Sequence, residues 1–145
     1  MKDSRGTVTA PLARHPSDRK KMAVVDGGKH AVTEYEVLED LSCFSLLRVL
    51  LQTGRTHQIR VHLSSVRHPV FGDPTYGGRR IHYGNVTGRY KAFVNDMLAF
   101  FPRQALHAGT LGFIHPTSRD KVVFSADPPE DMLELLRRIR QYMNG

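Results

Sequence analysis

Two strand-like segments joined by a short polar link constrain the fold of this chain more than any other feature. In residues 31–38, apolar and β-branched side chains alternate onto one face, as in a strand with one buried side. Residues 44–51 are apolar on both faces apart from Ser45 and Arg48, which is typical of a more central strand. Because a parallel return needs a dozen or more residues, the short link predicts an antiparallel hairpin.

A second pair of strand-like segments follows later in the chain. Residues 105–114 (ALHAGTLGFI) precede the turn HPTSRDK, after which residues 122–124 (VVF) are again apolar. This order predicts a second antiparallel pair, with helices between the two hairpins. We therefore predict an α+β fold in which helices flank a mixed, largely antiparallel sheet.

Two helices are expected between the hairpins. Thr56 is expected to cap the first, because its hydroxyl can accept a backbone hydrogen bond where the apolar stripe begins. That stripe consists of Ile59, Leu63 and Val66. Residues 90–101 predict the second helix, which Pro102 ends.

The clearest helix signal lies near residue 130. Asp127 is expected to cap this helix, with Pro128 in its first turn and Glu130 completing a capping box. One apolar stripe then follows the helical period: Met132, Leu135, Leu136, Ile139 and Met143.

Length and charge limit the possible classes of protein. A chain of 145 residues predicts one domain with a single core. Its 21 lysines and arginines against 14 acidic residues give a net charge of +7, which attracts polyanions such as nucleic acid. Residues 1–30 are expected to be an extended basic arm, in which Arg19, Lys20 and Lys21 either contact RNA or belong to a solvated loop.

Cysteine usage and hydropathy point to the cytoplasm. Cys43 is the single cysteine, so an internal disulfide framework and a cysteine-based zinc cluster are excluded. No apolar run approaches the ~20 residues that a membrane-spanning helix needs. We expect a cytoplasmic protein without a membrane partner.

The segment TGRTHQIRVHL, residues 53–63, is the strongest candidate for chemistry. A metal site fits it poorly, because His57 and His62 are five residues apart and lie roughly 140° from one another around a helix. A phosphate site fits better, since Arg55 offers a bidentate clamp and Thr56 a hydroxyl beside the free N–H groups of a helix N-terminus. An ordinary capped helix with exposed arginines remains an open alternative.

Longer motifs carry a resemblance to a known family. LLQTGRTHQIRVHLSSVRHPVFGDPTYGG (50–78) resembles the signature of the RluA-type RNA pseudouridine synthases. The similarity continues, in the family's order, in these segments: GTVTAPLARHPSDRKKMAVV (6–25), HAVTEYEVLE (30–39), RQALHAGTLGFIHP (103–116) and FSADPPEDM (124–132).

The resemblance implies a pseudouridine synthase-like fold and an enzyme that isomerises uridine in ribosomal or transfer RNA without a cofactor or a metal. Arg60 matches the family arginine that pairs with the catalytic aspartate. Leu106 matches a residue that packs under the active site. Arg55, Thr56 and His57 match the turn at the edge of the pocket, near the RNA backbone. His57 and His62 are expected to form hydrogen bonds and to pack, rather than to act as acid or base.

The chain departs from the family pattern in one large respect. The family's catalytic aspartate follows His-Arg-Leu, and none of the nine aspartates in this sequence does. Asp73, between Gly72 and Pro74, is expected to be a turn residue that binds local N–H groups rather than the nucleophile. The sequence therefore resembles the C-terminal part of a catalytic domain, in which Arg60 is expected to lack its carboxylate partner.

Three interpretations follow. In the first, the chain is part of a synthase, inactive alone and prone to self-association because its sheet is incomplete. In the second, it is a non-catalytic RNA-binding module on the same scaffold. A distant third is a metal-dependent hydrolase that uses His57 and His62.

Overall fold

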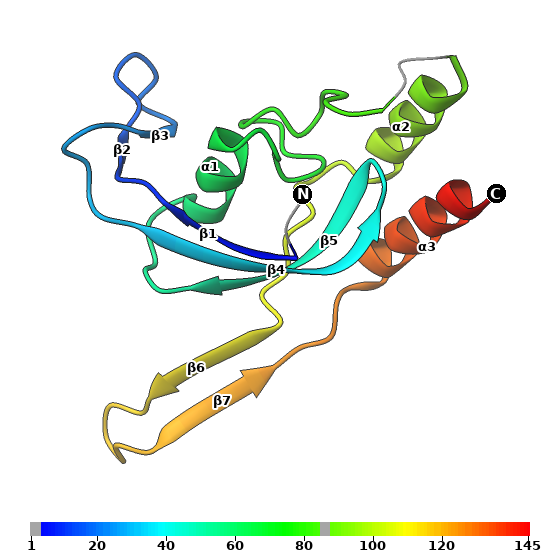
Figure 1. Ribbon diagram of the computed structural model, residues 1–145. Coiled ribbons are helices and arrows are strands. Elements are labelled where there is room, and N and C mark those ends of the chain that lie inside the picture. The colour runs from blue at the N-terminus through cyan, green and yellow to red at the C-terminus, as the bar shows by residue number, and fades with distance from the viewer. Residues whose placement is uncertain (1–3, 85–87) are drawn as a thin grey trace.

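A three-stranded antiparallel sheet forms the centre of the computed structural model, which describes residues 4–84 and 88–145 (Figure 1). Its order is β1 (Arg5–Thr9), β4 (Val32–Leu41) and β5 (Phe44–Leu51). The predicted hairpin between β4 and β5 is confirmed. The prediction that residues 44–51 are central is wrong for the described residues, because β1 occupies the other side of β4 and leaves β5 at an edge.

The N-terminal segment is more structured than the predicted basic arm. After β1, the strands β2 (Leu12–Arg14) and β3 (Met22–Val24) form a small antiparallel hairpin. Leu12 is only 2% exposed and packs with Ala31 and Val61. The arm prediction missed these strands because burial of a few apolar residues, and not periodicity, fixes such short segments.

Three helices complete the described chain: α1 (Gln58–Ser65), α2 (Gly88–Phe100) and α3 (Glu130–Asn144). The two long helices, α2 and α3, lie on the same side of the β4–β5 hairpin (Figure 1). They share a core of buried residues with the end of β4: Leu41, Met97, Phe101, Leu135 and Ile139. The predicted stripe of α3 is thus confirmed at Leu135 and Ile139.

The predicted cap of α3 is wrong. The helix begins at Glu130, Pro129 occupies the N-cap position, and no side chain caps it. Asp127 lies too early to reach the first turn, because the chain is still extended at Pro129. Asp131 instead forms an ion pair with Arg103, Oδ1 to Nη2 at 2.7 Å, which ties the first turn of α3 to the loop between α2 and β6.

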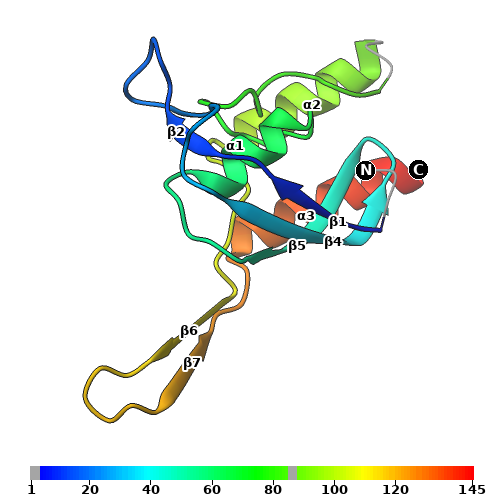
Figure 2. The same ribbon diagram turned by 60° about the vertical axis from the view of Figure 1, so that its left-hand side comes forward.

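The second predicted hairpin is confirmed as an antiparallel pair of β6 (Thr110–Ile114) and β7 (Lys121–Ser125). It forms a sheet of its own and projects away from the rest of the molecule (Figure 2). The α+β class and the antiparallel pairing are therefore confirmed. The expectation that both hairpins share one mixed sheet is not met among the described residues, where every ladder is antiparallel. Within this described part, no helix is long and apolar enough to cross a membrane.

Candidate functional site

The turn that leads into α1 is built around the buried side chain of Gln58. Its Oε1 accepts hydrogen bonds from the Thr53 hydroxyl (2.8 Å) and from the Arg55 N–H (3.0 Å). Its Nε2 donates to the Val32 carbonyl (2.9 Å), so the amide joins the turn to β4. The prediction that Thr56 caps the helix is wrong: His57, with φ of 56°, is the N-cap residue, and no side chain caps the helix.

His62 is a structural residue of α1. It is fully buried, its Nδ1 lies 2.9 Å from Thr33 Oγ1, and its Nε2 lies 3.0 Å from the Ala10 carbonyl oxygen. Both ring nitrogens therefore form hydrogen bonds within the protein. Neither is free to bind the metal ion that the hydrolase interpretation requires. Within residues 4–84 and 88–145, no cluster of histidine, cysteine or acidic side chains is arranged to hold a metal ion.

The buried face of α1 differs from the predicted one. The expected stripe included Val66, but that side chain is 40% exposed. The buried residues are Gln58, Val61, His62 and Leu63, so the predicted stripe is confirmed at Leu63. It did not foresee that two polar residues with satisfied hydrogen bonds, Gln58 and His62, occupy the core-facing side of the helix.

Arg60 forms a two-pronged ion pair with Asp73, which corrects the expectation that it lacks a carboxylate partner. Its Nε donates to Oδ2 at 2.7 Å and its Nη2 donates to Oδ1 at 2.8 Å. The side chain of Asp73 is fully buried and that of Arg60 is 13% exposed. Such bidentate geometry fixes the plane of the guanidinium group as well as its position.

Asp73 is also held by its own loop. Its Oδ1 accepts the N–H groups of Thr75 (2.9 Å) and Tyr76 (3.1 Å), so its predicted role as a turn residue is confirmed. Burial raises the pKa of this carboxyl group, but the hydrogen bonds from Arg60 and from the two N–H groups outweigh burial, and the net pKa lies below its ordinary value. Asp73 is thus an ionised anchor for Arg60.

Tyr76, from the same loop, joins three parts of the site. Its ring lies 4.8 Å from the guanidinium carbon of Arg60, within the range of a cation–π contact. Its hydroxyl oxygen lies 2.8 Å from His57 Nδ1 and accepts the Met22 N–H at 2.9 Å. Sequence reasoning assigned no role to Tyr76, although it lies three residues after Asp73 in a motif that was already singled out.

The basic candidates lie on the neighbouring hairpin and turn. Arg19, Lys20 and Lys21 belong to the segment between β2 and β3, and β3 contacts α1. Arg55, whose Nε donates to the His30 carbonyl at 3.3 Å, is exposed just before α1. The predicted phosphate contacts thus lie in two segments that adjoin α1, the turn before it and the β2–β3 hairpin.

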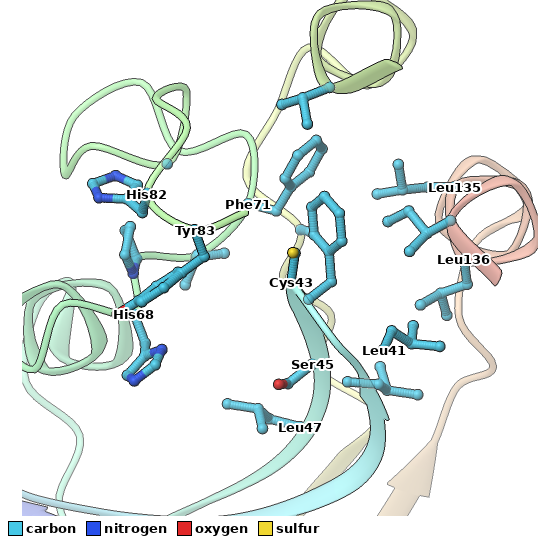
Figure 3. Close-up of a pocket in the computed structure, with 18 of the residues that line it drawn as sticks. Leu41, Cys43, Ser45, Leu47, His68, Phe71, His82, Tyr83, Leu135 and Leu136 are labelled. Carbon is cyan, nitrogen blue, oxygen red and sulfur yellow. The ribbon is translucent and has the colours of Figure 1, made fainter. Parts of the chain in front are cut away.

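Leu106 lies at a different place, in the lining of a cavity of about 640 Å³. Leu41 and Leu47 come from the β4–β5 hairpin, and the loop before α2 contributes His68 and Tyr83 (Figure 3). Arg60 is absent from this lining, so the described residues do not bring Leu106 and Arg60 into one cavity.

Comparison with known proteins relates this site to a family. The model of the RNA pseudouridylate synthase family matches residues 1–65. Ribosomal large subunit pseudouridine synthase D of Pseudomonas aeruginosa is 46% identical over 138 residues, which are 95% of this chain and 42% of that protein. An uncharacterized RNA pseudouridine synthase of Chlorobaculum parvum is 45% identical, over 99% of this chain and 45% of its own length. Over nearly its whole length, the chain is thus similar in sequence to RNA pseudouridine synthases.

Solved structures of this family have a matching fold. Human RNA pseudouridylate synthase domain containing 1 matches with a TM-score of 0.58 and 30% identity, over 89% of this chain and 50% of that one. Human RNA pseudouridylate synthase domain containing 4 matches with a TM-score of 0.67, over 94% of this chain and 57% of that one. Because the identity is only 24%, this similarity concerns the fold alone. The chain thus spans less than half the length of the curated relatives and about half of the solved ones.

Proposed function

We propose that the chain is the C-terminal part of the catalytic domain of an RNA pseudouridine synthase, which isomerises uridine in RNA without a cofactor. The observation that carries this proposal is the geometry of Arg60. Asp73 binds Nε and Nη2, and within the described residues Nη1 takes part in no hydrogen bond. The guanidinium group is therefore rigidly held while one nitrogen remains for a second carboxylate.

In the proposed reaction, that second carboxylate is the family's catalytic aspartate, supplied by sequence outside these 145 residues. Arg60 keeps it ionised, since a neighbouring positive charge favours the charged form. The C1′–N1 bond of the uridine breaks, the uracil turns, and C1′ is joined to C5, which then loses its proton while N1 gains one. Asp73 is unsuited to this task, because Arg60 and two backbone N–H groups occupy its oxygens.

The exposed basic residues supply the proposed contacts to RNA. Arg55, Thr56 and His57 lie in the turn before α1, and Arg19, Lys20 and Lys21 extend the positive surface along the β2–β3 hairpin. Phosphate contacts of this kind position a nucleic acid without reading its sequence. Leu106 is proposed to pack beneath the active site of the whole enzyme.

Ribosomal RNA is the proposed substrate, with transfer RNA as the alternative. Two of the relatives, from P. aeruginosa and Escherichia coli, are named as synthases of the large ribosomal subunit, and each is 46% identical to this chain. The net charge of +7 is compatible with either RNA.

A chimera tests the proposal. The 145 residues replace the matching segment of the P. aeruginosa relative, and the fusion is incubated with ribosomal RNA from a strain that lacks the native enzyme. We expect pseudouridine from the chimera and none from the chain alone. A folded chimera that forms no pseudouridine, beside an active parent enzyme, contradicts the proposal.

A non-catalytic RNA-binding module is the second candidate. One observation favours it: Asp73 already balances the charge of Arg60, so the arginine has a structural role without any further carboxylate. This interpretation predicts a folded, RNA-binding and inactive chimera, whereas the synthase interpretation predicts an active one.

A further inference from the structure

We propose that Tyr76 is a positioning residue whose hydroxyl group fixes the basic β2–β3 hairpin and the ring of His57 relative to Arg60, so that all three meet RNA as one surface. This inference rests on the proposed function, because it assigns that surface to RNA. It concerns a residue that neither the catalytic proposal nor the basic-surface proposal uses.

The contacts of Tyr76 come from segments far apart in the sequence. Its hydroxyl accepts the N–H of Met22, 54 residues away, and contacts His57, 19 residues away. Its backbone carbonyl accepts the Ser64 hydroxyl at 2.9 Å, which fastens the loop to α1. One side chain thus joins β3, the turn before α1 and the loop that holds Asp73.

The contact with Tyr76 assigns a protonation state to His57 in this proposal. The Tyr76 oxygen already accepts from Met22, and in the proposed arrangement its own hydrogen is donated to His57 Nδ1, which lies 2.8 Å away. His57 is then neutral, with its proton on Nε2. Burial and the nearby charge of Arg60 both lower the pKa of His57, while Asp73 opposes them, and the net direction agrees with a neutral ring.

The consequence is a defined donor at the edge of the basic surface. With Nδ1 held by Tyr76, the Nε2–H of His57 remains for an acceptor such as a phosphate oxygen or a base carbonyl. The Met22 contact meanwhile fixes the hairpin that carries Lys20 and Lys21. Packing alone does not require the hydroxyl, because the ring of Tyr76 lies against the Leu12, Ala31 and Val61 cluster.

Tyr76→Phe tests this role, because it removes the hydroxyl and keeps the ring. In nitrogen-15 spectra of the full chain, His57 should change from the single Nε2–H tautomer to a mixture. Exchange of the Met22 amide should rise about fivefold, the value of one net hydrogen bond. The dissociation constant for ribosomal RNA should rise by a similar factor of about five.

Tyr83→Phe is the matched control, since among the described residues its hydroxyl donates to the Arg67 carbonyl alone, at 2.6 Å. It should leave the His57 tautomer, the Met22 amide and the RNA affinity unchanged.

The outcomes separate this inference from the proposed function. An unchanged His57 tautomer and Met22 exchange in Tyr76→Phe overturn the positioning role. If both change but RNA affinity does not, the link to RNA is overturned while the synthase proposal stands. If the wild-type chain binds no RNA at all, the RNA-contact surface of the proposed function fails, and the two spectroscopic measurements still decide whether Tyr76 positions His57.

Discussion

At the scale of single residues, the Arg60–Asp73 pair is the feature that sequence reasoning could least foresee. The motif placed Arg60 and identified Asp73 as a turn residue, but the side chains are 13 positions apart and their contact depends on how the loop folds back onto α1. Gly78 makes that return possible, because a Cβ atom there would collide with the Val70 carbonyl oxygen.

Asp73→Asn should destabilise the chain by about 3 kcal/mol, the lower end for removal of one partner from a buried ion pair. Urea unfolding at pH 7 measures this change. Asp18→Asn is the control, because Asp18 pairs with Lys21 at 3.4 Å on the surface, where such pairs contribute less than about 1 kcal/mol. Equal effects of the two substitutions would contradict the account of Asp73.

The pH dependence of this difference has a defined sign. The folded pKa of Asp73 is lowered from its ordinary value of 3.8, so its stabilisation is present above that value and is lost as the pH falls through the folded pKa. The stability gap between wild type and Asp73→Asn should therefore be constant near neutral pH and shrink below about pH 4.

At the scale of elements, hydrophobic period and turn residues predicted the β4–β5 and β6–β7 hairpins and all three described helices. They failed where a polar residue is buried or where a short strand depends on its neighbours. His62 occupies the core side of α1 because two hydrogen bonds satisfy its ring, and β1 pairs with β4 although its sequence, RGTVT, has no strong strand pattern.

Substitution on α1 distinguishes the predicted face from the observed one. His62→Ala removes one hydrogen bond from buried Thr33, leaves the Ala10 carbonyl without its ring partner, and should cost about 3 kcal/mol of unfolding free energy. Val66→Ala, on the side that the stripe predicted to be buried, should cost less than about 0.5 kcal/mol. Chemical denaturation of both variants provides the measurement, and a reversed order would show that the helix faces are assigned wrongly.

At the scale of the whole molecule, the β6–β7 hairpin is the exposed apolar surface that most needs a partner. One face carries Leu111, Phe113 and Phe124, all exposed, and a two-stranded hairpin is marginal by itself. In the isolated chain a second copy is the available partner, so self-association through this hairpin is expected.

Light scattering tests that expectation. The cross-strand pair Leu111 and Phe124, replaced by Lys and Glu, should convert the associated chain to a monomer without loss of helical circular dichroism. The same charges at Thr110 and Ser125, which pair on the opposite face, serve as the control and should leave association in place. A wild-type chain that is monomeric at high concentration contradicts the expectation.

The positive charge of the chain predicts how its affinity for RNA depends on salt. The isolated chain should bind structured RNA with an affinity that falls as salt rises, and replacing Arg19, Lys20 and Lys21 by Gln should reduce the logarithmic salt slope by about 2. Arg137, Arg138 and Arg140 provide a control of equal charge, because they lie on α3 in ion pairs with Glu134 and Glu39. Similar salt slopes for both triple variants would show that the β2–β3 hairpin does not contact RNA more than α3 does.

The rate of pseudouridine formation by the chimera, with and without Arg60→Lys, tests the central claim most directly. A lysine keeps the charge but loses the fork that Asp73 orients, so the account predicts a rate on the order of 100-fold lower with RNA affinity nearly unchanged. Arg67→Lys in the same chimera should retain the full rate. An Arg60→Lys chimera that is folded and as fast as its parent would contradict the assignment of Arg60 to the active site.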